Sequence, residues 1–240
     1  MKNKGRIIPI FLFIALLLGG CTTAGKPAKQ DAPVSTRPSP KVRFVKFKTR
    51  DGLTLSGRLF GDGPVGVILA HMYPADQKSW SPTARTLSEQ GYTVLTFDFR
   101  GYGLSGGVKD IPKIDIDMQA ALEYLRRTNS KIFLVGASMG GTAALKTATQ
   151  TRVAGIAVAS APAEFMGLES GSTKNIKGPK LFMATGGDFT APETARRFYN
   201  EADEPREIQI LPGADHGTDM FGKQDSKALE ILIDWLKRYN

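Results

Sequence analysis

The sequence predicts an α/β fold, in which a mostly parallel central sheet carries helices on both faces and an antiparallel hairpin at its N-terminal end. Short apolar runs alternate with helix-like segments from residue 65 to the end of the 240-residue chain. This alternation is typical of parallel sheets with crossover helices. The run VGVILA at residues 65–70 is apolar throughout, as strands covered on both faces are. No later stretch interrupts the pattern, so we expect one folded domain over residues 41–240.

The folded domain is expected to open with a hairpin. Residues 42–49 alternate apolar and polar side chains, as a half-buried strand does. Asp51 and Gly52 form a strong hairpin-turn signal before the returning strand 53–60. The remaining elements are expected, in chain order, at 65–70 (strand), 81–91 (helix), 92–99 (strand), 114–128 (helix), 131–138 (strand), 139–151 (helix), 153–160 (strand), 180–187 (strand), 191–202 (helix), 206–213 (strand) and 226–240 (helix).

The first 40 residues have the features of an export signal followed by a tether. Three basic residues precede an apolar run at 7–18, which is shorter than the roughly 20 residues that span a bilayer and resembles the core of a signal peptide. LGGC at residues 18–21 resembles a bacterial lipobox, so cleavage after residue 20 and a diacylglycerol on Cys21 are expected. Residues 21–40 are rich in Pro, Ala, Ser, Thr and Lys, and they predict a flexible tether. We therefore expect a lipoprotein of the bacterial cell envelope, held to a membrane on its periplasmic or extracellular face.

Composition excludes several other kinds of protein. The formal charge is +9, and it falls to +6 once residues 1–20 are removed, because they hold three basic residues and no acidic one. No basic stripe is interleaved with aromatic residues, so nucleic-acid binding is not expected. Cys21 is the single cysteine, which excludes an internal disulfide. Two histidines without metal-ligand spacing predict no metal site, and we expect a monomer without cofactors.

A serine stands in the motif Gly-x-Ser-x-Gly, where an expected strand gives way to an expected helix. The segment VGASMGG places Ser138 between Gly136 and Gly140. A turn this tight needs small neighbours and lifts the serine hydroxyl clear of the carboxyl edge of the sheet. It also places the backbone N–H of Met139 at the start of a helix, where donors have no intrahelical acceptor. Ser138 is therefore the candidate nucleophile.

A serine nucleophile needs a base, and the base needs an acid to orient it. His216 in LPGADHG follows an expected strand, and Asp188 in ATGGDFTAP follows another. Both residues and Ser138 lie at carboxyl ends of expected strands, where open α/β sheets place their sites. The sequence thus predicts the triad Ser138, Asp188 and His216. Asp215 is the alternative acid, disfavoured because sequence neighbours rarely orient each other.

These landmarks together resemble the α/β-hydrolase superfamily, and within it small, capless serine hydrolases of the dienelactone-hydrolase and esterase type. The resemblance covers about residues 42–240 and rests on LAHMYPADQKSW, GYTVLTFDFRGYGLSGG, LVGASMGG, ATGGDFTAP and LPGADHG. It implies the α/β-hydrolase fold and a triad in the chain order serine, acid, histidine. It is more specific for the fold than for the reaction.

The resemblance also implies an oxyanion hole. Its donors would be the backbone N–H of Met139 and a second N–H from the HMYP loop, for which Tyr73 is favoured and Met72 is the alternative. His71 is expected to fix this loop rather than act as a base. Structural roles are also expected for Asp98, Arg100 and Ser105, and for the aromatic residues Phe97, Phe99 and Tyr102.

Residues 161–179, after the sixth expected strand, are too few for a helical cap and contain three glycines. An open site with a flexible lip is therefore expected, suited to small acyl esters or to esters on a polymer. The favoured function is carboxylic-ester hydrolysis. The alternatives are a thioesterase, peptidase or acyltransferase on the same triad, or a non-catalytic envelope binding protein.

Overall fold

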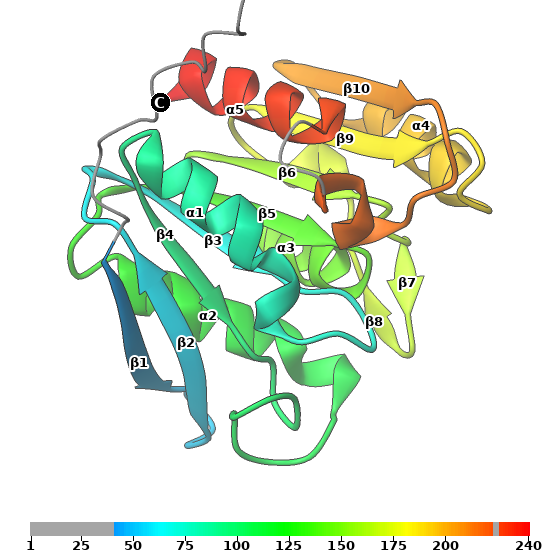
Figure 1. The fold of residues 1–240 in the computed structure, drawn as a ribbon. Helices are drawn as coiled ribbons and strands as arrows, with labels where there is room; N and C mark the ends of the chain where they lie inside the picture. The colour runs from blue at the N-terminus through cyan, green and yellow to red at the C-terminus, as the bar shows by residue number, and fades with distance from the viewer. Residues whose placement is uncertain (1–40, 223–225) are drawn as a thin grey trace, which may run out of the picture. The chain divides into compact units, whose positions relative to one another are not determined.

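An eight-stranded sheet forms the centre of the described chain (Figure 1). The computed structural model describes residues 41–222 and 226–240, which fall in the unit Pro38–Asn240. The expected signal peptide 1–20, Cys21 and the tether 21–40 lie outside the described residues. In spatial order the strands are β1 (Val42–Lys48), β2 (Thr54–Phe60), β4 (Tyr92–Phe97), β3 (Val65–Ala70), β5 (Lys131–Ala137), β6 (Gly155–Ala159), β9 (Lys180–Thr185) and β10 (Arg206–Leu211).

The sheet is antiparallel at one end and parallel elsewhere. β1 pairs antiparallel with β2, and β2 pairs antiparallel with β4. From β4 onward every neighbouring pair is parallel. Strands β4, β6 and β9 are buried along their whole length, which explains why their sequences are almost continuously apolar. The predicted fold class is confirmed.

Helices cover both faces of the sheet (Figure 1). On one face, α1 (Ser81–Glu89) and α5 (Lys227–Tyr239) pack in a core with Trp80 and Trp235. On the other, α2 (Ile114–Leu125), α3 (Met139–Gln150) and α4 (Ala191–Glu201) pack in a second core. Short 3₁₀ helices lie at η1 (Gln77–Trp80), η2 (Ile111–Lys113), η3 (Thr173–Asn175) and η4 (Gly217–Phe221). None of the helices in residues 41–222 and 226–240 is both long and apolar enough to cross a membrane.

The segment between β6 and β9 is more ordered than the sequence predicted. It forms a small hairpin from β7 (Glu164–Phe165) and β8 (Leu168–Glu169), followed by η3. The hairpin was missed because two-residue strands leave no periodic signal. Its turn places Met166 and Gly167 at positive φ. The absence of a helical cap between residues 161 and 179 agrees with the expectation.

The loop after β4 is held by buried charges. The Arg100 guanidinium lies 2.7 Å from Asp117 and 2.9 Å from Asp51, and the Arg100 and Asp117 side chains are 3% and 0% exposed. Asp98 accepts hydrogen bonds from the Gln77 side chain and backbone, and Ser105 donates one to the Asp98 carbonyl. The structural roles expected for Asp98, Arg100 and Ser105 are confirmed.

Replacing Arg100 with leucine is expected to lower the free energy of unfolding by about 3–5 kcal/mol, because the buried Asp117 loses its guanidinium partner and keeps only the backbone N–H of residue 100 as a donor. Chemical denaturation of both proteins measures the difference. Arg238 is a matched control, since its ion pair with Glu207 involves a 51%-exposed side chain. Arg238→Leu should cost less than about 1 kcal/mol. Equal losses in the two variants would contradict a special role for the buried pair.

Candidate active site

Ser138 lies at a sharp turn between β5 and α3. Its φ is +47° and its residue surface is 5% exposed. Positive φ is uncommon for a residue with a side chain, and such strain is often found at functional positions. The Ser138 N–H donates to the Ala159 carbonyl at 2.8 Å, and its carbonyl accepts from the Thr142 N–H at 3.0 Å. Backbone hydrogen bonds on both sides of Ser138 therefore hold the strained turn. The Ser138 hydroxyl forms no hydrogen bond with a described residue.

The small residues around Ser138 are required by close backbone approach. A Cβ on Gly136 would lie 2.3 Å from the Gly140 carbonyl oxygen. A Cβ on Gly140 would lie 2.5 Å from the carbonyl oxygen of Ala70, the last residue of β3. Both distances are far inside van der Waals contact, so neither position accepts a side chain without moving the backbone.

His216 and Asp188 form a hydrogen-bonded pair. The Nδ1 atom of His216 lies 2.9 Å and 3.0 Å from the two carboxylate oxygens of Asp188. The Asp188 side chain is 8% exposed and the His216 side chain 44% exposed. A proton on Nδ1 donates to the carboxylate and leaves Nε2 as the acceptor. The alternative acid, Asp215, is exposed, and its carbonyl accepts from the Thr185 hydroxyl at 2.8 Å.

The His216 loop packs beside the serine turn. The Gly217 N–H donates to the Ser160 hydroxyl at 3.1 Å, and a Cβ on Gly217 would lie 3.5 Å from the Cβ of Ala137. Ala137 immediately precedes Ser138. The structure describes no hydrogen bond between Ser138 and His216; such contacts often tighten only with substrate bound.

Ser160 was missed at the sequence level. It directly follows β6, and it ties that strand to the Gly217 backbone. The available signal was its place at the carboxyl end of an apolar strand, the same position that marks Ser138 and Asp188.

The Ser138 turn is followed at once by one free backbone donor, and a second is predicted from the loop after β3. Met139 is the first residue of α3, so its N–H has no acceptor within the helix. The Met72 carbonyl accepts from His71 Nδ1 at 2.9 Å. Because C=O and N–H point in opposite directions across a trans peptide, the Tyr73 N–H is directed away from the buried His71. Tyr73 stays the predicted second donor, with Met72 as the alternative.

His71 is a buried, neutral loop-fixing residue, as expected. Nδ1 contacts the Met72 carbonyl, and Nε2 accepts from the Phe99 N–H at 3.2 Å. Only a neutral ring can donate from one nitrogen and accept at the other. Burial lowers the pKa of His71 below its ordinary value of 6.5, and the hydrogen bond to Met72 only partly offsets this.

The free energy of unfolding is expected to fall as pH drops below 6.5. Below the ordinary pKa the unfolded chain takes up a proton at His71 that the folded chain, with its lowered pKa, does not. The slope is at most about 1.36 kcal/mol per pH unit for one group. Denaturation between pH 7.5 and 5.5 measures it, and His71→Gln should flatten the slope. His216→Gln is the control and should retain it; loss of the slope only in that variant would contradict the assignment.

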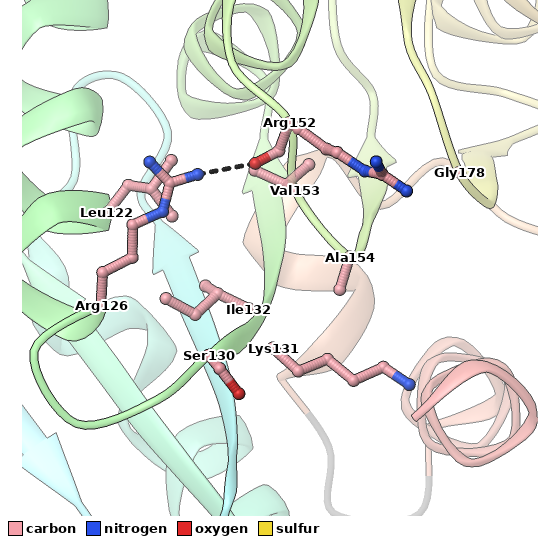
Figure 2. A pocket seen from close by; sticks show the side chains of 9 residues that line it. All are labelled: Leu122, Arg126, Ser130, Lys131, Ile132, Arg152, Val153, Ala154 and Gly178. Carbon is pink, nitrogen blue, oxygen red and sulfur yellow. Dashed lines mark hydrogen bonds between the residues drawn. The ribbon is translucent and has the colours of Figure 1, made fainter.

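The hollow in Figure 2 is separate from this site. It has a volume of about 480 Å³. It is lined by Leu122, Arg126, Ser130, Lys131, Ile132, Arg152, Val153, Ala154 and Gly178. Lys131 begins β5 and Ser138 follows its end, so the two lie about 23 Å apart along the strand at roughly 3.3 Å per residue. Residues 41–222 and 226–240 contain no cluster of three or more potential metal-binding side chains.

Comparison with known proteins finds one matching family and several similar proteins. The family described as serine aminopeptidase, S33, matches residues 66–170. The uncharacterized protein MT2364 of Mycobacterium tuberculosis (strain CDC 1551 / Oshkosh) is 25% identical, with 99% of this chain and 96% of that protein covered. A thermostable monoacylglycerol lipase from Bacillus sp. (strain H-257) is 27% identical over 62% of this chain and 61% of its own.

A solved structure agrees with the fold. The Pyrococcus furiosus esterase Pf2001 superposes with a TM-score of 0.73 at 22% identity, covering 84% of this chain and 94% of that one. The family match includes the Ser138 turn, and the structural match extends over most of the sheet. Together they support a hydrolase, and this chain has the α/β-hydrolase fold.

Proposed function

We propose that this protein is a serine hydrolase that cleaves carboxylic esters with Ser138, His216 and Asp188. The observation that carries the proposal is a serine on a strained strand–helix turn beside a loop that carries a histidine whose Nδ1 is held by a buried carboxylate. The printed names of a lipase and an esterase among the similar proteins support an ester substrate.

The mechanism follows from the positions of these groups. Ser138 Oγ attacks the ester carbonyl while His216 Nε2 takes its proton, and Asp188 orients the ring and stabilises its charged form. The N–H groups of Met139 and Tyr73 stabilise the negative oxygen of the tetrahedral intermediate. His216 then protonates the departing alcohol. Water activated by His216 attacks the acyl-enzyme, and the acid leaves.

The segment over the site suggests which esters fit. The β7–β8 hairpin places Phe165 against Tyr73, with ring centroids 5.9 Å apart, and Met166 at its turn is 62% exposed. No cap helix forms between residues 161 and 179, so the entrance admits small acyl esters or ester groups carried by a polymer. Acetyl groups on envelope glycans are one such class.

The test is hydrolysis of p-nitrophenyl esters from acetyl to decanoyl by the purified full chain. Activity on short esters that falls with acyl length would support both the reaction and a shallow acyl site. A folded protein that releases no p-nitrophenol from any ester, and no acetate from acetylated glycans, would overturn the proposal.

A peptidase is the second candidate, because the matching family is described as a serine aminopeptidase. The same triad would then attack an amide, and His216 would protonate the departing amine. Aminoacyl p-nitroanilides distinguish the two reactions. A higher kcat/KM on these amides than on p-nitrophenyl acetate would favour the peptidase. Thioester hydrolysis, acyl transfer to an acceptor other than water, and binding without catalysis are the other outcomes to be compared.

Lipid anchoring at Cys21 is also part of the proposal, and the lipobox-like LGGC segment supports it. The acylated chain would sit in the bacterial cell envelope, with residues 22–40 between the lipid and the folded domain. Metabolic labelling with a fatty-acid analogue tests this. Label in the wild-type chain that is lost in Cys21→Ser supports the anchor, and equal labelling contradicts it.

A further inference from the structure

Lys109 lies over two tyrosine rings beside the candidate active site. Its Nζ is 4.5 Å from the ring centroid of Tyr102 and 5.7 Å from that of Tyr73. A cation over an aromatic face is attracted by the ring, so these contacts restrict the position of a long, otherwise mobile side chain.

One ring contacts a proposed oxyanion donor residue, and the other belongs to such a residue. The Tyr102 hydroxyl donates to the Met139 sulfur at 3.7 Å, and Met139 follows Ser138. Tyr73 carries the second proposed N–H donor. The ammonium of Lys109 therefore lies over one residue that contacts Met139 and over another that carries the second proposed donor.

The charge of Lys109 is not neutralised by the described part of the chain. Lys109 is exposed and forms no ion pair with any described residue. The carboxylates of the loop that follows β4 have other partners: Asp110 lies 2.8 Å from Lys113, and Asp98 accepts from Gln77 and Leu104. Glu164 accepts from the Gly167 N–H in the hairpin turn.

The hydroxyls on the same two rings are further, uncharged donors. Tyr102 is 4% exposed, and the described chain offers its hydroxyl only the Met139 sulfur, a weak acceptor. Burial raises the pKa of Tyr102 to about 12, with a smaller contribution from Tyr73. The hydroxyl therefore stays protonated at neutral pH and can donate to an anion.

We propose that Lys109, together with the hydroxyls of Tyr73 and Tyr102, forms a subsite for an anionic group on the substrate, a carboxylate or a phosphate. The inference rests on the proposed function, because it names the class of ester that this site would prefer. The subsite acts on substrate binding, so its loss should raise KM for anionic esters and leave kcat nearly unchanged.

Matched esters test the subsite in the full chain. p-Nitrophenyl hemisuccinate carries a carboxylate in the acyl part and p-nitrophenyl butyrate is its neutral partner. 4-Acetoxybenzoate and 4-acetoxyphenyl phosphate carry the charge in the leaving group, with phenyl acetate as partner. In Lys109→Gln, kcat/KM should fall about threefold to fivefold for the anionic member of at least one pair, as expected for loss of an exposed charge pair. The neutral esters should be unchanged.

Three controls sharpen the result. Lys109→Arg should keep most of the preference, because the positive charge remains. Lys113→Gln should have no effect, since that lysine is paired with Asp110. Raising the ionic strength to about 0.5 M should weaken the wild-type preference by screening. Equal effects of Lys109→Gln on neutral and anionic esters, or no effect on either, would overturn the proposal.

Calorimetric binding of 4-nitrobenzoate, compared with neutral 4-nitrobenzamide, separates this proposal from the catalytic one. Tighter binding of the carboxylate that is lost in Lys109→Gln would support the subsite even if no ester is cleaved. Ester cleavage without a Lys109-dependent preference in either assay would overturn the subsite and leave the proposed function standing.

Discussion

Replacing Ser138 with alanine is expected to lower kcat for p-nitrophenyl ester hydrolysis by about 10⁴-fold or more, the scale of losses seen when a triad nucleophile is removed. The change deletes the atom proposed to form the acyl-enzyme. Donors at Met139 and Tyr73 remain, so weak residual catalysis by oxyanion stabilisation is expected, with KM little changed.

The same substitution should leave the fold intact. The Ser138 hydroxyl bonds no described residue, and the backbone bonds to Ala159 and Thr142 do not involve the side chain. The free energy of unfolding should change by no more than about 0.5 kcal/mol. Ser88→Ala, at a half-buried position of α1, is the matched control and should keep full activity. A folded Ser138→Ala protein with wild-type kcat would contradict the nucleophile assignment.

The structural features that could be predicted from the sequence are those determined by residues within one continuous segment. β5, the turn and α3 follow one another, and the steric need for Gly136 and Gly140 is local to that unit. Buried strands such as β4 and β9 are recognisable because both faces are covered, which makes most of their residues apolar. The three triad candidates could also be found in the sequence, because each of them directly follows an expected strand.

The features that were missed depend on contacts between distant segments. Ser160 was missed because its hydroxyl accepts a hydrogen bond from the Gly217 N–H, 57 positions later in the chain. Lys109 meets Tyr73 and Tyr102 only after two loops fold together. The preference for Asp188 over Asp215 came from the sequence, and the coordinates add the 2.9 Å contact between the Asp188 carboxylate and His216 Nδ1.

Changing Asp188 to asparagine is expected to lower kcat by about 10⁴-fold while preserving the fold, the effect known for the equivalent change in serine proteases. An amide at this position can donate to Nδ1 and so favour the wrong tautomer, in which Nε2 carries the proton and cannot accept one from Ser138. It also removes the negative charge that stabilises the protonated ring. Pre-steady-state release of p-nitrophenol measures the acylation step in which both defects act.

Asp215→Asn is the matched control for this prediction. It makes the same chemical change one residue from His216, but on an exposed carboxylate that forms no hydrogen bond with a described residue, so its activity should stay within about twofold of wild type. The two variants thus compare the acid chosen by geometry with the acid nearest in sequence. Loss of activity in Asp215→Asn with activity retained in Asp188→Asn would require His216 to turn away from the 2.9 Å contact seen here. It would also mean that the active loop conformation differs from this one.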